Sequence, residues 1–210
     1  MKKLTKISII TLLLIFIASI NAQNVKGLTI VGGLNQSNQN IEEDSELIEN
    51  NYISGYNLGI EKSFGIARFG VGLNQRGRKL DFEESFEELS ISMNQELTLN
   101  YLTLHAVYPY EIQEKISIFG GVQLGKGLGG ESMIKMSIST ALFRNVNTFD
   151  ESEDIDAEDM ELEYGLFLGG DYMIYEKIGV RASYFKGLSD IVEDSKTKNN
   201  TISVSLLFKE

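Results

Sequence analysis

The chain has 210 residues, a length that suits one domain, and a formal net charge of -11 at pH 7. So acidic a chain argues against a nucleic-acid partner, because contacts to phosphates need a basic surface. The absence of cysteine excludes disulfides and thiolate metal centres, and a single histidine excludes a metal site built on two histidines.

The N-terminus has the pattern of a targeting segment. Lys2, Lys3 and Lys6 precede an apolar run over residues 7–20, and small and polar residues follow. A basic start, a short apolar centre and a small-residue exit are typical of a secretory signal peptide. The run is short for a membrane-spanning helix, which needs about 20 apolar residues. We therefore predict a signal peptide over residues 1–22, cleaved after Ala22, and one domain over residues 23–210.

Beyond residue 23 the dominant pattern is an alternation of apolar and other residues with a period of two, which is typical of strands. Eight segments show it, and one of them is apolar on both faces, so its register stays open. Their apolar stripes lie within residues 28–34, 56–60, 69–73, 97–108, 116–124, 162–172, 178–184 and 202–208.

The connections between these segments alternate in length. Residues 63–66, 110–114 and 174–177 are short connections, whereas residues 37–51, 80–94, 128–160 and 189–198 are long. Outer-membrane barrels have short periplasmic turns and long outer loops. The lengths predict an all-β, eight-stranded antiparallel up-and-down transmembrane barrel. A short helix near residues 82–89 is one option in the second long loop. Residues 132–143 could extend the strands or fold over the mouth.

Alternation alone does not say which face points inward. The stripe opposite the apolar residues is rich in glycine, which weakens strands and has no use on a solvated surface. The lumen of an eight-stranded barrel is narrow and needs small residues. We therefore expect Phe69, Val71 and Leu73 to face lipid, and a soluble lipocalin-like barrel is the alternative. The glycines are Gly55, Gly59, Gly70, Gly72, Gly121, Gly125, Gly165 and Gly169.

Charged residues of both signs share the glycine-rich stripe and can pair inside the lumen. They are Glu61, Arg68, Arg76, Glu163 and Arg181, with Phe119, Phe167 and Phe185 beside them. Because a buried charge needs a partner, we expect bridges across the lumen and no open channel. Tyrosines at strand ends are expected in the interfacial girdles: Tyr52, Tyr101, Tyr108, Tyr110 and Tyr172.

Four segments resemble the PorT-like outer-membrane beta-barrel family, which is found widely in Bacteroidota. They are FGVGLNQRGRKL (69–80), LTLNYLTLHAVYPYE (97–111), ISIFGGVQLGKGL (116–128) and IGVRASYFKGLSDI (178–191). The resemblance covers nearly all of the mature chain and implies a barrel in the outer membrane of a Gram-negative cell. PorT itself is tied to protein secretion and gliding. No catalytic or ligand residue is carried over from the family.

Candidates for chemistry are few. His105 is the only histidine and would have to be the base of a nucleophilic site. Ser117 and Asp171 could complete such a site, but nothing in the sequence places them beside it. We expect neither enzymatic activity nor a cofactor.

Residues 150–163 contain nine carboxylates in fourteen positions. Asp154, Asp156 and Glu158 have the spacing of the start of an EF-hand loop, but Asp159 occupies the place of the required glycine. A solvated acidic loop is the simpler interpretation, with weak binding of divalent cations as the alternative.

The sequence thus favours a barrel in the cell outer membrane with a structural or interaction role, such as an accessory of secretion or surface assembly. Its expected partners are membrane lipid, lipopolysaccharide and a protein that meets the long loops. A small-solute pore and a barrel enzyme acting on lipid are the alternatives.

Overall fold

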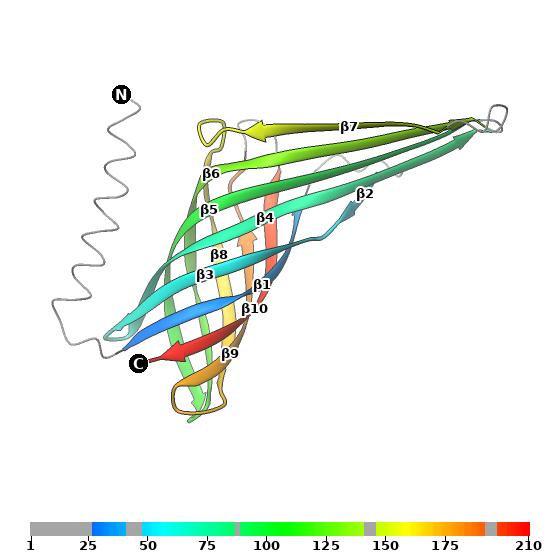
Figure 1. The fold of residues 1–210 in the computed structure, drawn as a ribbon. Coiled ribbons are helices and arrows are strands. Elements are labelled where there is room, and N and C mark those ends of the chain that lie inside the picture. Colours follow the sequence, from blue (N-terminus) through cyan, green and yellow to red (C-terminus); the bar gives the residue numbers. More distant parts are fainter. Residues whose placement is uncertain (1–26, 41–47, 87–88, 141–145, 192–196) are drawn as a thin grey trace.

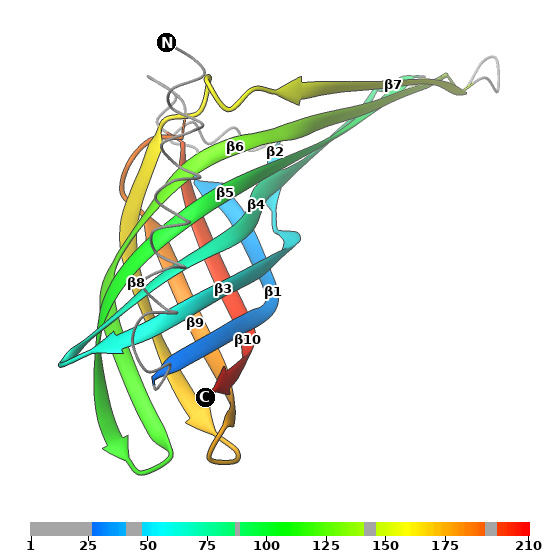
Figure 2. The ribbon, with the colours of Figure 1, turned by 60° about the vertical axis from the view of Figure 1, so that its left-hand side comes forward.

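The computed structural model describes residues 27–40, 48–86, 89–140, 146–191 and 197–210. In these ranges ten antiparallel strands form one sheet, and eight of them close into the barrel of Figures 1 and 2. The prediction of an eight-stranded antiparallel barrel is confirmed. The eight are β1 (Leu28–Asn40), β3 (Ile53–Phe64), β4 (Ala67–Phe86), β5 (Leu89–Gln113), β6 (Ile116–Thr140), β8 (Leu162–Met173), β9 (Ile178–Gly187) and β10 (Lys198–Lys209).

The barrel closes between its first and last strands. β1 pairs with β10 from Thr29 opposite Lys209 to Asn40 opposite Lys198, and β4 pairs with β5 to complete the ring. Closure leaves no open edge in the wall, so backbone groups are satisfied inside a bilayer. Among the residues described, no helix is long and apolar enough to cross a membrane. The predicted signal peptide lies outside the described residues.

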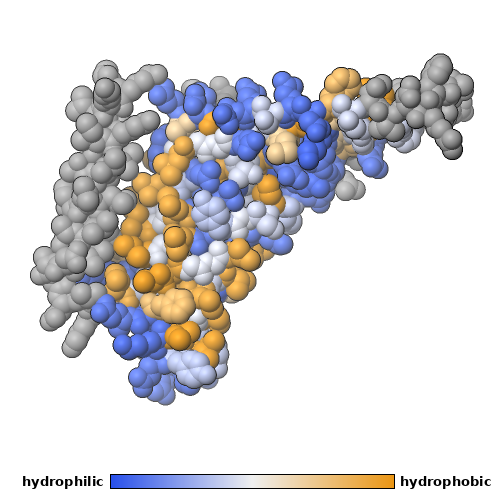
Figure 3. All heavy atoms as spheres, viewed as in Figure 1, coloured by the Kyte–Doolittle hydropathy of each residue, from blue (hydrophilic) through white to orange (hydrophobic). Residues whose placement is uncertain are grey.

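The apolar stripes point outward and the polar stripes point into the lumen. Phe69 and Leu73 are each 42% exposed, whereas Arg68 and Arg76 on the same strand are 5% and 2% exposed. Figure 3 shows the apolar belt on the barrel surface, with hydrophilic residues above and below it. This polarity is the reverse of a soluble barrel, so the predicted assignment of the faces is confirmed.

The glycines of the inner face make room for large lumen side chains. A Cβ on Gly169 would lie 2.4 Å from the ring of Phe119, and one on Gly70 would lie 2.3 Å from the ring of His105. Both distances are shorter than van der Waals contact. Glycine at these positions therefore allows aromatic groups to fill a narrow interior.

The short connections are where the sequence predicts them, but two of the predicted long loops are largely strand. β4 runs as far as Phe86 and β5 begins at Leu89, so the option of a short helix near residues 82–89 is wrong. β6 continues to Thr140, and β7 (Val146–Ile155) returns along it. β2 (Ile48–Asn51) pairs with the outer part of β4. Apolar residues alternate with polar ones in these segments, which suits a sheet better than a helix.

These outer segments form a sheet that projects from one side of the barrel (Figures 1 and 2). We call it the arm. It consists of β2, residues 77–86 of β4, residues 89–98 of β5, residues 130–140 of β6, and β7.

Candidate functional site: the barrel lumen

Two carboxylates and two guanidinium groups form a closed layer near the short-turn end of the lumen. Arg68 Nη1 and Arg181 Nε each lie 2.7 Å from an oxygen of Asp171, and Arg181 Nη2 donates to Glu61 Oε2 at 3.0 Å. Arg68 Nε lies 3.3 Å from the same Glu61 oxygen. All four residues are at most 5% exposed. Each charge therefore has an opposite neighbour, as burial requires.

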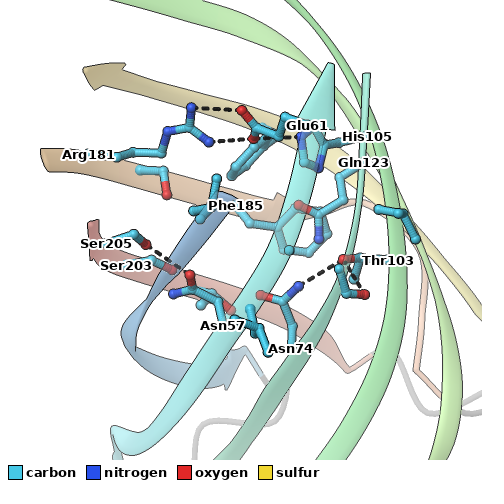
Figure 4. Close-up of a pocket in the computed structure, with 18 of the residues that line it drawn as sticks. Asn57, Glu61, Asn74, Thr103, His105, Gln123, Arg181, Phe185, Ser203 and Ser205 are labelled. Carbon is cyan, nitrogen blue, oxygen red and sulfur yellow. Dashed lines mark hydrogen bonds and ion pairs between the residues drawn. The ribbon is translucent and has the colours of Figure 1, made fainter. Parts of the chain in front are cut away.

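His105 belongs to this inner layer. Its Nε2 lies 2.8 Å from Glu61 Oε1, and its ring stands 5.2 Å from that of Phe167. Figure 4 shows the histidine beside the Glu61–Arg181 pair. Asp171 is engaged by the two arginines, and the carboxylate next to His105 is that of Glu61. The geometry thus makes His105 a member of a structural network.

A second charged layer lies nearer the outer mouth. Arg76 is paired with Glu163, which also accepts a hydrogen bond from Asn199 Nδ2 at 2.7 Å. The Arg76 guanidinium lies 4.0 Å from the ring centre of Phe185. Glu163 has no exposed surface, so this layer is also fully enclosed.

Tyr101 belongs to the outer layer and is not an interfacial tyrosine. It is 1% exposed, and its hydroxyl accepts a hydrogen bond from Asn199 at 3.1 Å. The girdle prediction is wrong for Tyr101 because residues 97–108 are apolar on both faces, which hid their register. Tyr52, Tyr108, Tyr110 and Tyr172 are exposed, as a girdle requires.

An apolar cluster covers the outer layer. Met160 and Ile191, from the segments that follow β7 and β9, pack on Leu99 and Tyr101 of β5. Lys126 Nζ donates to the carbonyl oxygen of Met160 at 2.7 Å, and the Glu161 amide donates to the carbonyl oxygen of Ile191 at 2.9 Å. These bonds hold both segments over the lumen.

Between the two charged layers lies a cavity of about 50 Å³. Polar side chains such as Asn57, Asn74 and Thr103 line it, and Figure 4 shows their arrangement. A water molecule needs about 10–15 Å³, so the cavity has room for a few waters.

The five charged residues named from the sequence are buried in the lumen, where Glu61 contacts Arg68 and Arg181, and Arg76 contacts Glu163. From the sequence, Asp171 was considered only as a residue that could complete a nucleophilic site with His105, so its place in the inner layer was missed. The signal was present, because Asp171 has the same strand parity as Glu163 and Gly169.

The candidate cation ligands are not gathered into a site. Asp154 lies at the end of β7, Asp156 and Glu158 lie in the turn after it, and all three are exposed. Within the described ranges, no group of three or more His, Cys, Asp or Glu side chains could hold a metal ion. Residues 150–155, predicted as loop, are strand.

Solved structures with similar folds are outer-membrane barrels. Neisserial surface protein A (NspA) aligns with 88% of this chain and 98% of its own, with a TM-score of 0.53 and 11% identity. Ail of Yersinia pestis, solved with the heparin analogue sucrose octasulfate, covers 88% and 99%, with a TM-score of 0.47 and 19% identity. The Escherichia coli outer membrane protease OmpT covers 88% and 97%, with a TM-score of 0.42 and 10% identity. At these identities the likeness concerns the fold alone.

A comparison with curated protein sequences gives no match. The family profile described as "Outer membrane protein beta-barrel domain" matches residues 8–209. That match spans nearly the whole chain and agrees with the closed barrel and its apolar belt. The chain therefore belongs to the outer membrane protein beta-barrel domain family, and it is a protein of the outer membrane.

Proposed function

We propose that this barrel does not conduct solutes and acts through the strands and loops that it holds outside the membrane. One observation carries the proposal. The lumen is filled by two ion-paired layers and covered by an apolar cluster, while three barrel strands continue beyond the barrel into the arm.

The small-solute pore is the second candidate, and the lumen argues against it. A conducting pore needs a continuous polar path, whereas Phe119 and Phe185 are 5% and 2% exposed within the barrel. Eight strands leave space that side chains nearly fill. An enzymatic role is also disfavoured, because His105 is bound to Glu61 in the enclosed inner layer.

The resemblance to PorT-like barrels supports a role as an accessory of secretion or surface assembly. Contact with lipopolysaccharide is part of the proposal, because Lys186 is exposed at the outer end of β9, where anionic headgroups would lie. Comparing proteins released by cells with and without this chain tests the secretion role. Unchanged release would contradict it.

Planar-bilayer recording tests the closed lumen. The purified, refolded protein is expected to give no reproducible conductance steps. The double variant Arg76→Ala/Tyr101→Ala removes side chains of the outer layer only and is also expected to stay closed, because the inner layer remains. Stable steps from the wild-type protein would overturn the proposed function.

A further inference from the structure

One face of the arm is apolar. It is continuous with the lumen side of the barrel wall, and we call it the arm face. Its central row runs across four strands, with Phe82 opposite Met93, Met93 opposite Met136, and Met136 opposite Phe149. Leu97 and Ile155 lie on this face next to the barrel. Farther out, its apolar side chains include Leu80, Phe82, Ile91, Met93, Ile134, Met136, Ile138 and Phe149.

In β5 the sequence pattern itself reverses polarity where the strand leaves the barrel. Leu102 and Leu104 point outward to lipid, and Thr103 between them points into the lumen. In the arm the odd-numbered residues Ile91 and Met93 are apolar instead, and serine alternates with them. The apolar side of the strand thus moves from the outer face to the lumen-side face.

In β6 a β-bulge produces the same reversal. Val122 and Leu124 in the barrel and Ile134 and Met136 in the arm are all even-numbered. Tyr101 lies opposite Gly127 and Asn100 opposite Gly129, so Leu128 is an extra residue in β6. One extra residue exchanges the faces of everything beyond it. The bulge therefore turns Ile134 and Met136 to the arm face.

The outer part of the arm face has no cover within the described part of the chain. Next to the barrel, Leu97 and Ile155 pack against the Met160–Ile191 cluster, and beyond them the arm strands pair edge to edge. Phe149 is 56% exposed, and the remaining apolar side chains except Leu80 are partly exposed. The opposite face is polar, and its Ser92 and Ser137 hydroxyl groups are hydrogen-bonded at 2.7 Å. Only one side of the arm is therefore suited to water.

Carboxylates border the arm face on both sides. Glu84 lies on β4 at one margin, and Glu151 and Glu153 lie on β7 at the other. The arm as a whole has ten acidic and three basic residues, a net charge of -7. Two arms placed face to face would bring these charges together, which disfavours a second copy as the occupant.

We infer that the arm face binds an amphipathic helix of a partner protein, with Lys or Arg along both of its flanks. The inference rests on the proposed function and adds the partner's chemistry. The neighbouring strands β5 and β6 together are about 10 Å wide, which matches the diameter of a helix. Methionine side chains adapt to irregular apolar surfaces, and Met93 and Met136 would do so against the side chains of the helix. Basic flanks would meet the carboxylates of both margins.

A fluorescent label on the arm tests the inference. The chain has no cysteine, so Gln95→Cys on the arm face and Ser92→Cys on the polar face each give one labelled site. The protein is refolded into nanodiscs of zwitterionic lipid. The first probe is a synthetic helical peptide with a leucine face and lysine flanks. The second has glutamate flanks, and the third has serine in place of leucine.

The lysine-flanked peptide is expected to shift the emission at Gln95→Cys to the blue in a saturable way and to leave Ser92→Cys unchanged. The other two peptides are expected to bind at least about tenfold more weakly. Glu84→Gln/Glu151→Gln/Glu153→Gln removes the margin charges and should weaken binding on the order of tenfold. Glu83→Gln/Asp150→Asn/Asp154→Asn makes the same change on the polar face of the same strands and should leave binding within about twofold.

Equal shifts at both labels would show that the peptide binds the lipid, and equal effects of the two triple variants would remove the role of the margins. Either result overturns the inference. A blue shift of the emission on adding unlabelled copies of this protein, without peptide, would also overturn it, because the occupant would then be a second copy of the chain. No binding together with a closed lumen overturns this inference and leaves the proposed function standing. A conducting lumen overturns the proposed function whatever the peptide does.

Discussion

Replacing Glu163 with alanine tests whether the lumen is filled. Glu163 is enclosed by Arg76, Asn199 and the outer cluster, and it has no exposed surface. The substitution leaves the Arg76 guanidinium buried without its carboxylate and removes an acceptor from the Asn199 amide. We therefore expect a large loss of free energy of unfolding.

The expected size follows from the environment of the pair. Removing one partner of a buried ion pair costs about 3–5 kcal/mol, whereas an exposed pair contributes about 0–1 kcal/mol. The double variant Arg76→Leu/Glu163→Leu leaves no charge behind and should recover at least half of the loss. Glu161→Ala removes an exposed carboxylate two residues away and should change stability by less than about 0.5 kcal/mol.

Urea unfolding of the protein in lipid vesicles, followed by circular dichroism and gel mobility, gives these free energies. The chain has no tryptophan, so fluorescence would depend on its nine tyrosines. If Glu163→Ala lowers the free energy of unfolding by less than about 1 kcal/mol, the pair contributes no more than a solvent-exposed ion pair does. This result would show that water reaches the outer layer, and the argument for a closed lumen would fail.

Other expectations follow from the wall of the barrel. Leu73→Arg should reduce insertion into vesicles by about 2–4 kcal/mol, because it places a charge in lipid; a wild-type yield would mean that the faces are reversed. Gly72→Leu should also lower the folded yield, since a Cβ there would lie 2.8 Å from the carbonyl oxygen of Leu58. Gly129→Val should lose about 1–3 kcal/mol in urea unfolding, because Gly129 has a φ of +115°. The folded protein should change its gel mobility on boiling, and identical mobility would contradict a stable barrel.

The barrel could be predicted from the sequence because its signals are local. Strand period, glycine content and the alternation of short and long connections each reside in a few neighbouring residues. The strand alternation that turns Phe69 to lipid turns Arg68 into the lumen, so the alternation alone was enough to assign five of the buried charged residues to the lumen. Their exact pairing did not follow from it, because it depends on which strands meet across the barrel. Arg68 reaches Asp171, 103 residues away.

The arm could not be predicted in the same way. The apolar residues in 82–89 are spaced in a way that fits a strand as well as a helix. The many carboxylates of this segment are typical of a loop. Its neighbours in the sheet include residues 130–140, whose sequence is compatible either with longer strands or with a segment folded over the mouth. The bulge at Leu128 left no trace in the pattern, because the apolar residues of β6 keep the same parity on both sides of it.

The apolar side changes face in β5 through the sequence pattern and in β6 through the bulge. Two different causes thus give the same apolar arm face, which is an argument that the face has a function. Without the bulge, Ile134 and Met136 would lie on the face of Ser92, and each side of the arm would mix apolar and polar residues. The bulge instead gathers them beside Ile91 and Met93. A sheet held in water gains nothing from one continuous apolar face unless something covers it. Binding of a partner gives that face a use, whereas simple continuation of the barrel strands would not have produced it.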